Sequence, residues 1–168
     1  MRKVDGAGER PIIKGARKFL VVVDDTPECR VAVRFAGWRA QRTGGSLLLL
    51  RIIEPDQGHT HWIAVEERMR EEAFDDAENL VQEIASDIND WAGLVPAVSI
   101  RQGKIQAEVL AQIDEDPGIG VLVLGASAGP EGPGPLVTAL AGKLSGSMRV
   151  PITVVPGNLT NLEVDALA

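Results

Sequence analysis

The sequence has few of the residues on which extracellular and metal-binding proteins rely. Its 168 residues include one cysteine and two histidines, so no disulfide can form within the chain and a zinc-type ligand set is lacking. No apolar stretch reaches the length of a membrane span, and the first residues lack the apolar core of a signal peptide. These absences favour a cytoplasmic protein in a reducing compartment, and we expect no membrane partner.

The charge of the chain is unevenly distributed. The formal net charge is −7, while residues 1–18 hold six basic and two acidic residues, so that the rest of the chain carries −11. An acidic body argues against nucleic acid as a partner. We therefore expect residues 1–17 to form a basic, flexible tail, residues 18–156 a single domain with a full core, and residues 157–168 a second tail.

Apolar runs alternate with helical patterns along the whole domain. The runs are β-branched or leucine-rich and do not alternate with polar residues, which is typical of strands buried on both faces. They lie at 18–24, 46–53, 96–100, 121–125 and 152–155. Four helices are expected between them, including a long one over 62–91 with an apolar stripe along its length. This order predicts an α/β fold with one doubly wound parallel sheet of five strands and helices on both faces.

Ligands of such sheets bind at the carboxyl ends of the strands where the winding reverses. The two strongest strands end at Asp24 and Gly125, and a glycine-rich loop follows the second. A loop of this kind, placed before a helix, can hold phosphate with backbone N–H groups. The residues that could contribute are Gly125, Ser127, Gly129, Gly132 and Gly134, with a hydroxyl from Thr138.

A rigid surface loop explains the same residues. Pro130, Pro133 and Pro135 have no backbone N–H, and Glu131 adds negative charge where phosphate would bind. Asp24 can likewise be a helix-entry residue. Cys29, in the first turn of the next helix, is interpreted as a packed core thiol rather than a reactive one. His59 and His61 are interpreted as part of a solvated loop rather than a metal site.

The residues resemble the universal stress protein family over about 18–156. The matching segments are 19–24, the turn at Gly103, Leu122–Gly125 and the closing run 150–155. The resemblance implies an adenine nucleotide alpha hydrolase-like sheet of order 3-2-1-4-5. It also implies a homodimer formed by edge-to-edge pairing of the last strands, through Ile152, Thr153, Val154 and Val155. Asp24 would lie beside a bound nucleoside, and the backbone at Val23 would meet the adenine edge.

Members of this family that bind ATP carry Gly-x-x-Gly, nine residues, and then Gly-Ser or Gly-Thr. Counting from Gly125, the second glycine is replaced by Ala128. A shifted frame starts at Gly129 and Gly132 and ends at Gly142, but then has lysine in place of the hydroxyl residue. The resemblance therefore implies a degraded motif, with ATP as a possible ligand and no metal beyond the magnesium that accompanies ATP.

Three functions remain open from the sequence. The first is a cytoplasmic stress-response homodimer that acts through an unidentified protein partner, tuned by an adenine nucleotide, and is not an enzyme. The second is an ATP-binding switch with slow hydrolysis, which needs a working phosphate loop. The third is an enzyme of unknown substrate, for which no acid, base or metal group can be singled out.

Overall fold

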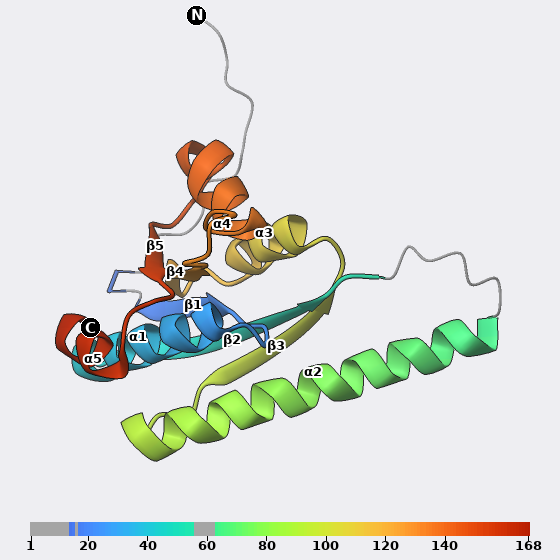
Figure 1. Cartoon of the computed structure of the whole chain (residues 1–168), viewed down its shortest axis with the longest axis horizontal. Helices are drawn as coiled ribbons and strands as arrows, with labels where there is room; N and C mark the ends of the chain where they lie inside the picture. The colour runs from blue at the N-terminus through green and yellow to red at the C-terminus, as the bar shows by residue number, and fades with distance from the viewer. Residues whose placement is uncertain (1–13, 16, 56–62) are drawn as a thin grey trace, which may run out of the picture.

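A computed structural model describes residues 14–15, 17–55 and 63–168 of the chain. Within this part, five parallel strands form one sheet in the order β3-β2-β1-β4-β5 (Figure 1). The strands are β1 (Lys18–Val22), β2 (Ser46–Ile53), β3 (Ala97–Gln102), β4 (Ile119–Ala126) and β5 (Ile152–Pro156). The predicted fold class and strand order are confirmed. The strands that lead to Asp24 and Gly125 are neighbours, also as predicted.

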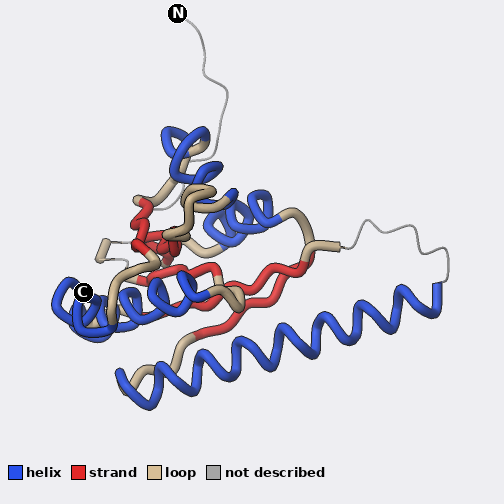
Figure 2. Tube along the Cα trace, viewed as in Figure 1, coloured by secondary structure: helices blue, strands red, loops and turns tan. Residues whose placement is uncertain are grey.

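Helices cover both faces of the sheet (Figure 2). One face carries α1 (Pro27–Thr43), α2 (Ile63–Ala92) and the C-terminal α5 (Asn161–Leu167). The other face carries α3 (Ile105–Glu115) and the segment that follows β4. That segment is divided into the three-residue α4 (Pro135–Val137), a π-helix η1 (Thr138–Lys143) and a 3₁₀ turn η2 (Ser145–Ser147).

The first helix is bounded by the residues that its sequence indicates. The Thr26 side chain caps the helix by accepting a hydrogen bond from the Cys29 N–H at 3.3 Å, and Pro27 occupies the first turn. Gly44 ends it in the left-handed conformation, with φ of 65°. The cap fixes the direction in which α1 leaves the carboxyl end of β1, where a ligand site is expected.

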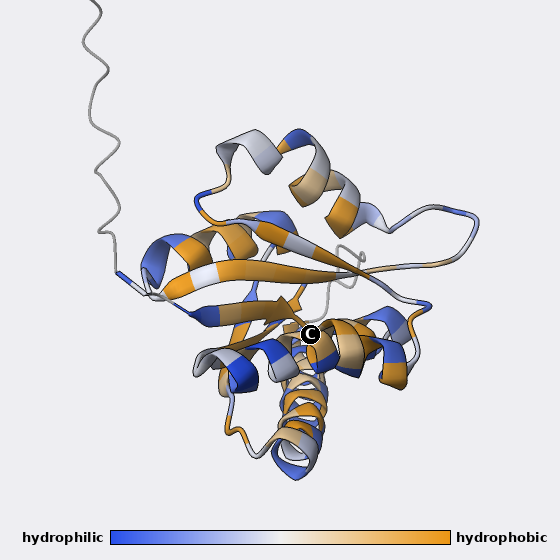
Figure 3. Cartoon of the chain, turned by 90° about the vertical axis from the view of Figure 1, so that its left-hand side faces the viewer, coloured by the Kyte–Doolittle hydropathy of each residue, from blue (hydrophilic) through white to orange (hydrophobic). Residues whose placement is uncertain are grey.

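Two apolar layers hold the sheet between its helices. Successive side chains of a strand point to opposite faces, so Val21 and Leu49 pack against α1 and α2 whereas Leu20 and Leu50 pack against α3 and η1. All four are fully buried. Figure 3 shows the result, with hydrophobic strands inside and hydrophilic outer faces on the helices. Fully burying one such side chain contributes about 2 kcal/mol.

The long helix α2 is packed along only part of its length. Its buried residues, Ala77, Val81, Ile84 and Ile88, all lie in the C-terminal half. In the N-terminal half, Ile63, Val65 and Met69 are exposed, and this part extends beyond the end of the sheet (Figure 1). The apolar stripe predicted along this helix is therefore buried from Ala77 onward and exposed in the first turns; Trp62 lies outside the described residues.

The predicted C-terminal tail contains a helix, which corrects the sequence interpretation of residues 157–168. Thr160 and Glu163 form a reciprocal capping box at the start of α5. Val164 is fully buried, and Asp165 accepts two hydrogen bonds from Arg34 of α1 at 2.6 and 2.7 Å. This segment is a docked part of the fold. Most of the predicted basic tail over 1–17 lies outside the described residues.

Candidate functional site

The carboxyl ends of β1, β2 and β4 surround a small cavity of about 230 Å³. The first turn of α1 and the start of α4 close its sides. Of the predicted site residues, Val23, Asp24, Gly125 and Gly134 line it, whereas Ser127, Gly129, Gly132 and Thr138 do not. The structure thus brings half of the predicted set together, at the place where the order of the sheet reverses.

The backbone at Val23 is already engaged on the β2 side. Its N–H donates to the Leu50 carbonyl at 2.8 Å, which extends the β1–β2 pairing beyond the strand end. Its carbonyl oxygen accepts a long hydrogen bond of 3.4 Å from the Arg51 guanidinium. A ligand that forms hydrogen bonds with the backbone of Val23 would therefore have to share or displace Leu50 and Arg51.

Asp24 organises the entry into α1. Its Oδ1 accepts hydrogen bonds from both the backbone N–H and the hydroxyl of Thr26, and Thr26 in turn caps the helix. The helix-entry role considered from the sequence is therefore present. Asp24 nevertheless lines the cavity and is only partly buried, so the carboxylate keeps acceptor capacity for a ligand hydroxyl.

The cysteine beside this site belongs to the core. Cys29 is 3% exposed, and its Sγ accepts a hydrogen bond from the Asp24 N–H at 3.3 Å. Burial, the largest influence, raises the pKa of the Cys29 thiol to about 12. The thiol is thus protonated at neutral pH, which agrees with the interpretation of a packed rather than reactive cysteine.

Gly125 is required by close packing against the first turn of α1. A Cβ atom at this position would meet the carbonyl oxygen of Glu28 and would lie 2.7 Å from its carbonyl carbon. Nearby, a Cβ at Gly157 would approach the Ala126 carbonyl oxygen and the Glu28 side chain. The end of β4 therefore fits against the first turn of α1 only because these positions lack side chains.

The glycine-rich loop satisfies many of its own backbone groups. The Ser127 N–H donates to the Pro133 carbonyl at 3.1 Å, the Gly129 N–H to the Ser127 hydroxyl at 3.3 Å, and the Gly132 N–H to the Gly129 carbonyl at 3.3 Å. The prolines of the loop add no donors. Three of the loop's N–H donors are thus used inside the loop, as in a rigid surface loop.

Gly134, with φ of 103°, is the N-cap of the helix that begins at Pro135. The Thr138 hydroxyl donates to the Gly134 carbonyl at 2.8 Å. Gly142, the last glycine of the shifted motif frame, lies inside the π-helix η1. That frame therefore does not place Gly142 at a helix start, where a phosphate-binding glycine would be needed.

Arg51 is a site residue that the sequence interpretation missed. It lies on β2 and lines the small cavity, and its Nε atom is buried without a hydrogen-bond partner in the described part of the chain. A buried, unsatisfied guanidinium nitrogen is unfavourable unless a ligand or water completes it. The signal in the sequence was one arginine inside the otherwise apolar run 46–53.

The sequence analysis also did not single out Lys104 and Glu54, which line a second and larger cavity. This cavity of about 690 Å³ lies beside the first and shares Ile105, Pro135 and Leu136 with it.

No cluster of three or more histidine, cysteine or acidic side chains suited to a metal occurs among residues 14–15, 17–55 and 63–168. His59 and His61 lie outside those ranges. None of the described helices has the length and apolarity needed to cross a bilayer.

The sequence matches one family model over residues 15–156, nearly the whole of the described fold. The chain belongs to the Universal stress protein family. The resemblance noted from its strand ends and closing run is thereby confirmed at the level of the family. A comparison with curated protein sequences gave no match, so further relationships come from structure.

Solved universal stress proteins share the fold at low sequence identity. UspA from Lactobacillus plantarum superposes with a TM-score of 0.69 at 18% identity, covering 82% of this chain and 96% of that one. A family protein from Burkholderia pseudomallei gives 0.60 at 14% identity, covering 89% and 98%. A family protein from Arabidopsis thaliana, solved with AMP bound, gives 0.57 at 16% identity, covering 83% and 90%.

Proposed function

We propose that this universal stress protein is a stress-response homodimer that acts through protein partners and holds the nucleoside part of an adenine nucleotide in the small cavity. The observation that carries the nucleotide part is the cavity at the ends of β1, β2 and β4, with Asp24 on its wall. Two relatives of the same fold were solved with AMP and with cAMP. In this proposal Asp24 accepts hydrogen bonds from ribose hydroxyls, and the apolar residues hold the base.

The loop geometry favours a nucleotide with one phosphate over ATP. The donors of Ser127, Gly129 and Gly132 are used inside the loop, and the Glu131 carboxylate repels a highly charged phosphate chain. The ATP switch with slow hydrolysis is accordingly the less favoured alternative. Magnesium would enter only together with ATP.

We predict that calorimetry with AMP and adenosine gives saturable heats, whereas ATP with magnesium binds more weakly. Glu131→Gln should strengthen AMP binding by about threefold, since an exposed like charge contributes less than about 1 kcal/mol. The matched control is Glu72→Gln on the exposed part of α2, which should change nothing. Absence of heat with any of these ligands at millimolar concentration would remove the nucleotide from the proposal, and tighter binding of ATP would restore the switch.

The homodimer part rests on the edge strand β5. It is the last strand of the sheet, as predicted, and Val154 is 38% exposed on it. The Pro151 carbonyl accepts a hydrogen bond from the Leu122 N–H of β4, and alternate residues of a parallel strand direct their backbone groups to opposite sides. Ile152 and Val154 therefore direct theirs toward the open edge. Pairing with a second copy about a two-fold axis would satisfy these groups.

Val154→Pro is expected to convert the dimer into a monomer. The substitution removes an outward N–H and leaves the pairing with β4 in place, because proline is tolerated on the open side of an edge strand. Val154→Thr keeps the N–H and should remain dimeric. Sedimentation at micromolar concentration distinguishes them, and a wild-type monomer or a dimeric proline variant would refute pairing through β5.

A further inference from the structure

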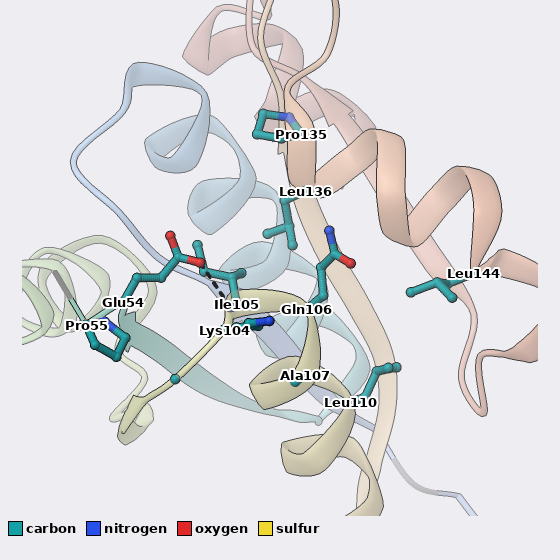
Figure 4. Close-up of a pocket in the computed structure, with 11 residues that line it drawn as sticks. Glu54, Pro55, Lys104, Ile105, Gln106, Ala107, Leu110, Pro135, Leu136 and Leu144 are labelled. Atoms are coloured by element: carbon teal, nitrogen blue, oxygen red, sulfur yellow. Dashed lines mark hydrogen bonds between the residues drawn. The ribbon is translucent and has the colours of Figure 1, made fainter. Parts of the chain in front are cut away.

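The larger cavity has the size and the lining of a ligand site. Its volume of about 690 Å³ falls within the range of about 300–1,000 Å³ that is common for small-molecule sites. It lies between α3 and the segment after β4, beside the proposed nucleotide cavity, with which it shares Ile105, Pro135 and Leu136 (Figure 4). Nothing in the proposed function uses this space.

The walls are largely apolar and come from two sides. Leu110 of α3 and Leu144, which follows η1, point toward one another across the gap, and Leu136 points in from the start of α4 (Figure 4). The gap has a structural cause. The segment after β4 is split into α, π and 3₁₀ turns, so it lacks the regular ridge that would pack along a neighbouring helix.

The polar side chains of this cavity lie near the start of α3. Glu54 accepts a hydrogen bond from the Ile105 N–H at 3.3 Å, which places its carboxylate at the amino end of that helix. Lys104 is exposed and, among the described residues that line the cavity, is the one cationic side chain. A ligand seated here meets apolar walls and one ammonium group, with the charge of Glu54 held beside the helix end.

We propose that this cavity binds an amphipathic carboxylate, a molecule with an unbranched apolar body and one carboxylate, as in a medium-chain fatty acid. The apolar body would occupy the space between Leu110 and Leu144, and the carboxylate would pair with Lys104. Charge complementarity selects a singly charged head, because Glu54 at the same end disfavours a more highly charged one. This site adjoins the proposed nucleotide site and shares three wall residues with it, but Glu54 and Lys104 do not line the nucleotide cavity.

The test uses decanoate as the probe in titration calorimetry on the full chain. Saturable binding is expected, and Lys104→Gln should weaken it by about tenfold because a charge-assisted contact is lost. Glu54→Gln keeps an oxygen for the Ile105 N–H and removes the negative charge, so it should strengthen binding by about threefold. The matched control Arg39→Gln, exposed on α1 on the opposite face of the sheet, should leave the affinity unchanged.

A second variant tests the walls. Ala107→Trp projects an indole from α3 into the space and should abolish decanoate binding while AMP binding persists, which separates this proposal from the nucleotide one. Ala64→Trp, on the exposed start of α2, is the control, and thermal melting verifies that both variants fold. Failure of wild type to bind decanoate, equal binding by folded Ala107→Trp, or equal affinity for uncharged decanol would each overturn the proposal.

Discussion

Gly125→Ala is expected to destabilise the protein by about 3 kcal/mol, although it adds one methyl group at the surface of a cavity. The new Cβ would meet the backbone of Glu28 in the first turn of α1, 2.7 Å from the carbonyl carbon. A backbone atom cannot rotate away as a side chain can, so α1 or the end of β4 must shift. Because both elements line the small cavity, nucleotide binding should be lost together with stability. Denaturant unfolding measures the effect.

The control for this prediction lies four residues further along the chain. At Gly129 a Cβ would have one neighbour within 4 Å, the Ser127 hydroxyl at 3.5 Å, which is an ordinary contact. Gly129→Ala should therefore change the free energy of unfolding by less than about 0.5 kcal/mol. Equal effects of the two substitutions would contradict the close-packing role assigned to Gly125.

Asp165→Ala is expected to lower the free energy of unfolding by about 2 kcal/mol at neutral pH. Asp165 accepts two hydrogen bonds from Arg34, and the pair is only 22% and 30% exposed. Bidentate pairing of this kind is stronger than an ordinary surface ion pair. Arg34 also stacks over Trp91, with 5.3 Å between the guanidinium carbon and the ring centroid. Loss of the carboxylate leaves that guanidinium without its anion and loosens α5 from α1.

The destabilisation caused by Asp165→Ala should become smaller as the pH falls. The hydrogen bond from Arg34 is the main cause that lowers the pKa of Asp165 below its usual value of 3.8. A carboxylate with a lowered pKa stabilises the fold above its unfolded-state pKa, and this contribution disappears as the pH falls through the folded-state value. The difference between wild type and Asp165→Ala should therefore be full at pH 6 and shrink below about pH 4. Asp114→Ala, in the exposed pair with Arg149, should have little effect at any pH.

The sequence predicts the sheet well because its signals are local and strong. Strands buried on both faces leave continuous apolar runs such as 19–23, and strict alternation with helices leaves few possible topologies. The start of α1 is equally predictable from the sequence, since Thr26 and Pro27 each have one favoured position at the start of a helix. The order of the strands came from the family resemblance, not from these patterns.

The candidate site is only half predictable, because its geometry depends on long-range packing. Gly125 looks like a phosphate-binding glycine, but its requirement comes from Glu28, far away in the sequence. The hydrogen bonds that close the loop on itself depend on where Pro133 returns to Ser127. Neither the packing of Gly125 against Glu28 nor the hydrogen bond between Ser127 and Pro133 leaves a periodic signal in the sequence. The predicted tail failed for a similar reason, since α5 is short and owes its place to partners on α1.

The uneven packing of α2 divides one continuous helix into two parts with different stabilities. Residues 77–92 are anchored in the core and should open only when the whole domain unfolds, whereas residues 63–76 depend mainly on their own backbone hydrogen bonds and exposed i,i+4 pairs such as Arg68–Glu72. Amide protons of residues 63–76 should therefore exchange with solvent within seconds to minutes. Those of residues 77–92 should exchange only at the rate of global unfolding. Substitutions at the exposed positions of residues 63–72 should therefore change the surface with little effect on the free energy of unfolding.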